Sequence, residues 1–159
     1  MNSQVFFLLL FLVSMVACKK KTSTTNPPAT TEFTFKVDGT AIKVDSAKAT
    51  LYTLGIAPFG RMIDVYAFKG GIEVLEFHFR PITGTSVADG TFSNSWLTYK
   101  AGNVFPDDYY HSSSGTLKIS LCDTLTKKIE GTFDFIGSNG TGTKNITEGI
   151  LKVDITQVQ

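Results

Sequence analysis

His78 is the residue best placed for acid/base chemistry in this chain of 159 residues. It follows Phe77 in a segment that alternates apolar and polar residues, so Glu76 and Arg80 project to the same side as the histidine. Pairing with the preceding alternating segment places Asp64 opposite His78. Such a group could transfer protons, but cross-strand charge clusters are usually solvated structural pairs. We therefore expect a charge cluster rather than a catalytic site.

The other residues with chemical potential lack the partners that their chemistry needs. His111 has no metal-ligand spacing to any residue except Asp107 and Asp108, and those acids lack the alternating oxygen ligands of a calcium loop. Cys122 has no nearby histidine to activate its thiol. The glycine-rich segment 137–143 lacks the Gly-Lys-Ser/Thr ending of a phosphate loop. We predict no metal, no cofactor and no enzymatic activity.

An aromatic segment is the most promising candidate for binding. Residues 96–111 contain one Trp, three Tyr, one Phe and one His, and Gly102 and Pro106 break the segment into a loop. Exposed rings on a loop suit sugar faces or protein hot spots. The alternative is that the rings cover one open end of the core. The predicted binding residues are Trp96, Tyr99, Tyr109 and Tyr110.

These candidates lie in a domain whose apolar residues recur with a period of two from Phe33 onward, which predicts β-strands. Asp38-Gly39 is a strong hairpin signal, because a type I′ turn needs positive φ at both central residues. A two-residue turn there pairs Phe35 with Ile42. Pattern and turn agree on this first hairpin.

A second hairpin is predicted within residues 61–80. A two-residue Gly-Gly turn would set Val65 opposite a glutamate, whereas a three-residue loop, Gly70 to Ile72, sets it opposite a phenylalanine. We expect the three-residue loop, which also sets Lys69 opposite Glu73.

A third hairpin is expected to turn at residues 124–126. It would pair Leu117 with Phe133, Leu121 with Ile129 and Asp123 with Lys127. Further alternating segments raise the expected number of strands, and no long segment carries a helical stripe. We predict an all-β domain: an antiparallel two-sheet sandwich of about eight to ten strands, with a partly closed β-barrel as the alternative.

Residues 1–17 predict an export signal. The apolar run from Val5 to Val13 is shorter than the about 20 residues of a membrane-spanning helix. It ends at Ala17-Cys18 before a lysine triplet, which resembles the lipobox of bacterial lipoproteins. The resemblance implies cleavage after Ala17 and acylation of Cys18, which would anchor the protein stably. The alternative is an ordinary secretory signal with a chance cysteine.

The segment 18–31 reads as a flexible tether, and residues 32–159 read as the domain. Removing the three lysines at 19–21 from the 15 Lys and Arg leaves 12 basic residues against 14 acidic residues in the domain. This balance argues against a nucleic-acid partner.

Six phrases of the domain together resemble a group of small Bacteroidota cell-envelope lipoproteins built on a single domain of unknown function. The resemblance implies a lipid-anchored β domain with no catalytic residue to carry over. The phrases are FTFKVDGTA (33–41), LEFHF (75–79), WLTYKAG (96–102), SGTLKIS (114–120), KKIEGTFDF (127–135) and ITEGILKV (146–153).

In the same bacterial group, Asp-Ser/Thr-Ala/Leu triplets resemble O-glycosylation acceptors, which would make Ser46 and Thr124 modification sites. The lysines after Cys18 lack the acidic residues of that group's surface-export signal, which favours the periplasmic leaflet of the outer membrane over the cell surface. We therefore expect a lipid-anchored protein of the bacterial cell envelope that binds a protein or glycan without catalysis. A structural envelope component is the alternative, and a hydrolase is less favoured.

Overall fold

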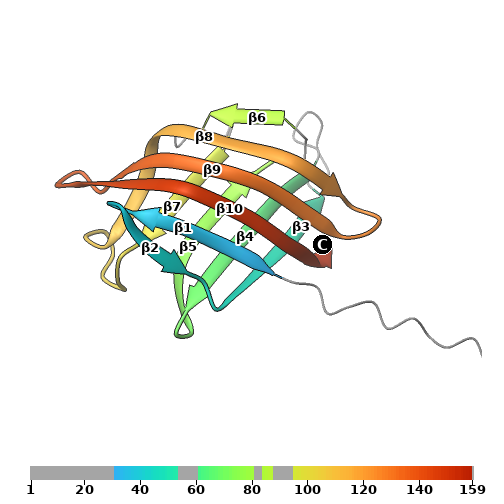
Figure 1. The fold of residues 1–159 in the computed structure, drawn as a ribbon, viewed down its shortest axis with the longest axis horizontal. Coiled ribbons are helices and arrows are strands. Elements are labelled where there is room, and N and C mark those ends of the chain that lie inside the picture. The colour runs from blue at the N-terminus through green and yellow to red at the C-terminus, as the bar shows by residue number, and fades with distance from the viewer. Residues whose placement is uncertain (1–30, 54–60, 81–83, 88–94, 159) are drawn as a thin grey trace, which may run out of the picture.

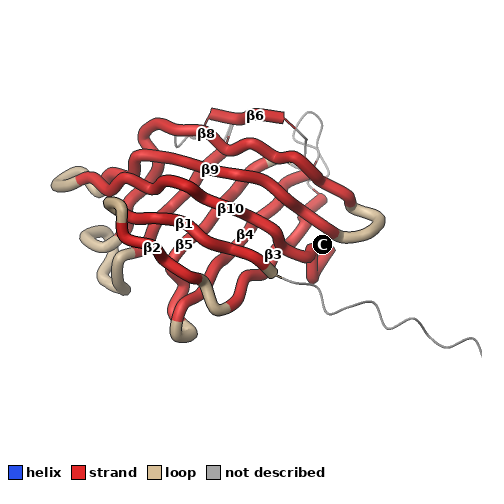
Figure 2. Tube along the Cα trace, viewed as in Figure 1, coloured by secondary structure: helices blue, strands red, loops and turns tan. Residues whose placement is uncertain are grey.

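The structure is a computed structural model that describes residues 31–53, 61–80, 84–87 and 95–158. None of these segments forms a helix of the length and apolarity that crossing a membrane requires. The described regular elements are all strands, as Figures 1 and 2 show. They are β1 (Glu32–Val37), β2 (Thr40–Lys43), β3 (Ser46–Thr53), β4 (Arg61–Lys69), β5 (Ile72–Phe79), β6 (Gly84–Val87), β7 (Ser95–Lys100), β8 (Tyr109–Asp123), β9 (Lys128–Ser138) and β10 (Thr143–Val158).

Seven of these strands close into a barrel, in the order β10, β3, β4, β5, β7, β8, β9 and back to β10. The closing pair is the parallel one, in which Ile155 of β10 lies opposite Ala49 of β3. The all-β prediction is confirmed, but the described strands form the barrel given as the alternative rather than the two-sheet sandwich. The reason is strand length: β8 and β10, of 15 and 16 residues, each pair with two different strands along one edge, so the sheet meets itself.

The hairpin of β1 and β2 lies beside the ring, with β1 paired to the first part of β10. Asp38 and Gly39 have φ of 49° and 81°, and Phe35 lies opposite Ile42. The predicted two-residue turn and its register are therefore confirmed.

The interior of the barrel is filled by apolar side chains around one phenylalanine. The ring centroid of Phe133 lies 4.7 Å from that of Phe77, 5.6 Å from that of Phe33 and 6.1 Å from that of Phe35. All four rings are buried, and such tilted or edge-on pairs add to the free energy of burial. The four come from β1, β5 and β9, so this group joins strands that are not adjacent in the ladder.

For the second hairpin, the predicted core pairs are confirmed and the predicted turn is wrong. Val65 faces a phenylalanine, as predicted. However, the turn contains only Gly70 and Gly71, with φ of 60° and 78°, and Lys69 faces Ile72 rather than a glutamate. A bulge in β5 takes up the extra residue, which lets the glycines form the tight turn without moving the core residues to the outer face.

The third hairpin also has a different turn from the predicted one. Leu117 lies opposite Phe133 as predicted, but the turn takes four residues, 124–127, and Asp123 pairs with Lys128. A register shift after Ile119 also places Leu121 opposite Glu130, so the predicted pair of Leu121 with Ile129 is wrong. The Asp123 carboxylate accepts hydrogen bonds from the backbone N–H groups of Leu125 and Thr126, which stabilises the longer turn.

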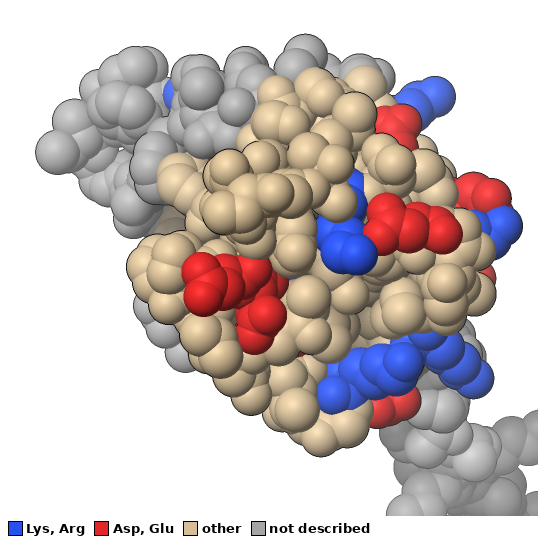
Figure 3. Space-filling model, turned by 90° about the vertical axis from the view of Figure 1, so that its left-hand side faces the viewer, with Lys and Arg blue, Asp and Glu red and all other residues tan. Residues whose placement is uncertain are grey.

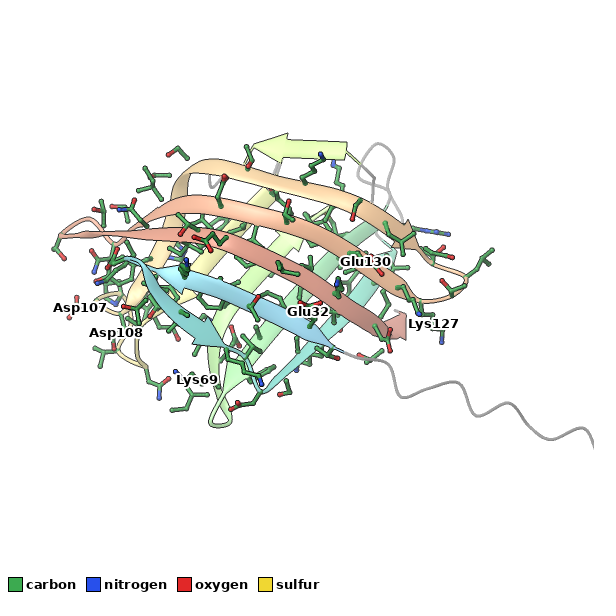
Figure 4. The ribbon with its side chains drawn as sticks, in the orientation of Figure 1. Glu32, Lys69, Asp107, Asp108, Lys127 and Glu130 are labelled. Atoms are coloured by element: carbon green, nitrogen blue, oxygen red, sulfur yellow. The ribbon has the colours of Figure 1, made fainter. Side chains whose placement is uncertain are left out.

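The registers define two ends of the barrel. At the proximal end, Glu32 at the start of β1 lies opposite Lys152, near the β8–β9 turn at 124–127. The distal end carries the loops 101–108 and 139–142 and the β1–β2 turn. Figure 4 shows the two ends, with Lys127 at the proximal end and Asp107 and Asp108 at the distal end.

We predict that Gly149→Ala destabilises the domain by about 1 to 3 kcal/mol, because a Cβ there would lie 2.5 Å from the Phe133 ring and displace the centre of the core. Denaturant titration measures the change. Gly142→Ala is the matched control, since its Cβ would meet nothing closer than 3.9 Å. Equal losses in the two variants would contradict the role given to Phe133.

Candidate functional site

Five charged side chains on the outer face of β4, β5 and β7 form a continuous chain of alternating sign. His78 Nδ1 lies 2.7 Å from Asp64 Oδ1, and its Nε2 lies 2.8 Å from Glu76 Oε1. Lys100 Nζ lies 3.0 Å from Glu76 Oε2 and 2.5 Å from Glu73 Oε1. We call these five residues the outer-face cluster.

The strand registers position the outer-face cluster. Asp64 lies opposite His78 across β4 and β5, as the sequence predicts. Lys100 is the member that sequence reasoning missed, because β5 and β7 are paired without a connecting turn. Its alternation with Trp96 indicates an outward direction but not the neighbouring strand. Arg80, predicted beside the histidine, forms no hydrogen bond through its buried Nε within the described part of the chain.

The hydrogen bonds of the outer-face cluster stabilise the charged form of its members. Hydrogen bonds to the Asp64 and Glu76 carboxylates raise the pKa of His78 from 6.5 to about 9. The hydrogen bonds from His78 and Lys100 in turn lower the pKa of Glu76 from 4.5 to about 2. Burial opposes the charge of Lys100, but its hydrogen bonds to Glu73 and Glu76 prevail and raise its pKa. At neutral pH the imidazole is therefore an imidazolium that donates from both nitrogens, and it is not a base.

A second polar group lies next to the outer-face cluster on β7 and β8. Trp96 Nε1 donates to Thr98 Oγ1 at 3.0 Å and to His111 Nδ1 at 3.2 Å, and the rings of Trp96 and His111 meet edge-on at 5.4 Å. Burial lowers the pKa of His111, so this histidine is neutral at pH 7. The two histidines of the chain therefore differ in charge on one face of the barrel.

The structure separates the four predicted aromatic binding residues into two faces. Tyr99 and Tyr110 lie opposite each other and turn inward at the distal end, where Tyr99 packs on Phe35 at 6.2 Å. Burial raises the pKa of Tyr99. These two rings close the core, as the alternative interpretation described. Trp96 and Tyr109 lie on the outer face, where the Lys100 ammonium sits 4.9 Å from the centre of the Tyr109 ring.

Two apolar residues that the prediction did not include are the exposed part of the aromatic segment. Val104 and Phe105, in the loop between β7 and β8, are 60% and 70% exposed. The Phe105 ring packs edge-on against Tyr109 at 5.3 Å, which leaves most of its surface in solvent. The pattern of apolar residues gives no signal for their exposure, because they lie in a loop, where neither the helical nor the strand periodicity of side-chain directions applies.

Hydrogen bonds fix the conformation of this β7–β8 loop. Asp108 receives a hydrogen bond from Val104 N to its Oδ2 at 2.9 Å, and its own N–H donates to the Val104 carbonyl at 2.8 Å. The Asp108 carbonyl accepts from Ala101 N, and Asn139 Nδ2 donates to the Asp107 carbonyl at 2.5 Å. A Cβ at Gly102 would collide with the Asp108 carboxylate, so a side chain there would displace the group that accepts the Val104 N–H. The apolar residues are thus presented on an ordered loop.

The β7–β8 loop also carries uncompensated negative charge. Asp107 and Asp108 form no salt bridge with any residue that the structure describes. Figure 3 views the distal end and shows an acidic group that lies apart from the basic side chains. The loop therefore combines an exposed apolar pair with two carboxylates.

The other predicted site residues do not belong to this loop or lie outside the described residues. Ser46 is exposed at the start of β3, and Thr124 lies in the β8–β9 turn. The aspartate before each has a structural role: Asp45 accepts from Gly70 N at 2.6 Å, and Asp123 caps its own turn. Cys18, the predicted signal and the tether up to residue 30 lie outside the described residues.

No acidic or histidine group in the described ranges has the arrangement of a metal site. No family model, curated protein or solved structure matches the chain. The fold and site define an all-β barrel with an ordered, apolar loop at one end.

We predict that the domain loses stability between about pH 7 and about pH 10 through His78. The folded state binds this proton more tightly than the unfolded chain, so the stabilisation is complete below pH 6.5 and is lost as pH rises through about 9. The loss is on the order of 2 kcal/mol. Denaturant titrations across this range measure it.

His78→Gln is the control, because it keeps a polar side chain but cannot carry the charge. The variant should show a flatter profile over the same alkaline range. Parallel profiles for the wild type and the variant would contradict the assignment of the proton to His78.

Proposed function

We propose that this protein is a non-enzymatic binding module of the bacterial cell envelope. A lipid anchor on Cys18 holds it to the outer membrane on the periplasmic side, and the β7–β8 loop engages a protein or glycan partner. The observation that carries this proposal is the exposure of Val104 and Phe105 on a loop fixed by hydrogen bonds.

The exposed pair supports recognition because the domain does not need it for its own core. Tyr99 packs against the core at the distal end, whereas Phe105 is 70% exposed and meets the outward ring of Tyr109 edge-on. Exposed apolar residues on an ordered loop bury area in a complex at little cost in conformational entropy. Unlike the single exposed Leu125, Val104 and Phe105 are adjacent and present a continuous apolar surface.

The direction of the chain is consistent with this role. The domain begins at Glu32 at the proximal end, where the tether from the membrane would join it, and the β7–β8 loop lies at the distal end. A protein held in this way presents the loop away from its own anchor.

The electrostatics of the barrel support a binding module over the hydrolase alternative. A hydrolase needs a base that accepts a proton at neutral pH. His78 is held as an imidazolium between two carboxylates, and the Glu76 carboxylate is occupied by two cations. These groups stabilise the face and are poorly suited to proton transfer.

We predict that the double substitution Val104→Ser, Phe105→Ser lowers partner binding by about tenfold or more, because burying these side chains supplies roughly 2 kcal/mol or more of an interface. The melting temperature should not fall, since both residues are exposed. The measurement compares lipidated full-length variants for crosslinking to envelope proteins and for co-sedimentation with purified envelope glycans.

Leu125→Ser is the matched control, because Leu125 is 92% exposed but lies in the proximal β8–β9 turn. It removes a comparable exposed apolar residue and should leave binding unchanged. Unchanged binding in the loop variant, or equal loss in both, would remove the loop from the proposed function.

The anchor is tested separately. We predict that the wild type partitions into the detergent phase and that Cys18→Ser does not, because acyl chains on this residue supply the membrane affinity. Mass spectrometry of the N-terminal peptide should show an acylated Cys18 with residues 1–17 removed. An unmodified cysteine or an intact signal on the wild type would rule out lipidation.

A further inference from the structure

We infer that the partner of the β7–β8 loop is a protein whose surface carries an apolar pocket with a basic rim. The inference rests on the proposed function, since it assigns a chemistry to the partner of the same loop. Val104 and Phe105 require the pocket, and Asp107 and Asp108 require the rim.

The shape of the loop calls for a concave partner. Val104 and Phe105 are neighbours in a turn that projects beyond the ends of β7 and β8 (Figure 1). Both are more than half exposed, so neither fills a hollow in the barrel itself. A projecting apolar pair is desolvated best by a pocket, and central apolar anchors of this kind dominate protein interfaces.

The polar groups of the β7–β8 loop speak against a glycan. Sugar recognition combines a free ring face with side chains that are free to bond hydroxyls. The loop presents one exposed ring, that of Phe105, and it meets Tyr109 edge-on rather than beside a second parallel face. The Asp108 Oδ2 already accepts the Val104 N–H, which leaves the Asp107 carboxylate as the one free acid of the loop among the described residues. The Asp107 carbonyl is occupied by Asn139. What the loop offers a partner is apolar surface and negative charge.

The charge of the β7–β8 loop speaks against a lipid surface. Insertion of Phe105 into a bilayer would bring Asp107 and Asp108 to the headgroups, and anionic lipids repel carboxylates. The loop also lies at the end of the barrel opposite the start of the domain. A protein pocket does not carry this penalty.

The same charges favour cations on the partner. Because neither carboxylate is paired within the described part of the chain, lysine or arginine at the rim of the pocket would form new ion pairs on binding. Residues 139–142 lie beside the loop through the contact of Asn139 with the Asp107 carbonyl, so they extend the surface toward the roughly 800 Å² per partner of a stable interface.

The test places a photoreactive side chain at the loop of the full-length protein in its native cells. Phe105→p-benzoylphenylalanine should give a light-dependent adduct with one protein, and the same substitution at Leu125 should not. Adding Asp107→Lys should weaken the adduct about tenfold, since it replaces attraction to the basic rim by repulsion.

The purified partner then allows a second readout that a purely structural role would not alter. Affinity should fall as salt rises from about 50 mM to about 500 mM, and it should fall less for Asp107→Lys than for the wild type. Melting temperatures of the variants should match, because the Asp107 side chain is exposed.

Adducts that contain only glycan or lipid would overturn the inference, as would an adduct that Asp107→Lys leaves unchanged. These failures differ from failure of the proposed function. If the wild type co-sediments with envelope glycans and the Val104→Ser, Phe105→Ser variant does not, the loop still binds and only the protein partner is wrong. If that double variant binds normally, the loop has no role in binding.

Discussion

The parallel pairing of β10 with β3 is the constraint on which the rest of the molecule depends. It joins the last strand of the chain to one of the first, and it turns a curved sheet into a ring with one enclosed interior. Because the ring is closed, every strand in it has an inner face and an outer face. The phenylalanines around Phe133 can then come from β1, β5 and β9 and still share one core.

Closure also decides what the outer face can do. Neighbouring strands bring carboxylates and cations within hydrogen-bond distance, and the outer-face cluster satisfies its charges internally. Groups that are held in this way contribute to stability over a range of pH and offer little to a substrate. In the proposed function, recognition is left to the loops, whose backbone the barrel holds at both ends.

The distal end separates packed from exposed apolar residues within one short segment. Tyr99 and Tyr110 are inward residues of paired strands, so they complete the core. Val104 and Phe105 follow the end of β7 and belong to neither face of the sheet. The loop bonds centred on Asp108 keep them exposed rather than collapsed onto the barrel. Apolar exposure here is therefore a property of an ordered loop, which is the basis of the proposed binding role.

Local patterns in the sequence determined most of the strands, the Asp38-Gly39 turn and the contact of Asp64 with His78, because alternation and adjacent turns act over short distances. They also gave the core register of the first two hairpins and the pair Leu117–Phe133, but not β6 or the first part of β8. The bulges beside Gly70-Gly71 and in the third hairpin were not predicted from the sequence. An extra residue close to the turn leaves the core pairs Val65–Phe77 and Leu117–Phe133 unchanged, so the apolar pattern does not reveal it. Lys100 in the outer-face cluster, the inward turn of Tyr99 and Tyr110, and the barrel itself were decided only by tertiary structure. The barrel and the place of Lys100 depend on pairing between strands that no turn connects, and the direction of Tyr99 and Tyr110 depends on the register across the long β7–β8 loop. The free energy that selects such pairs comes from burying the whole interior at once.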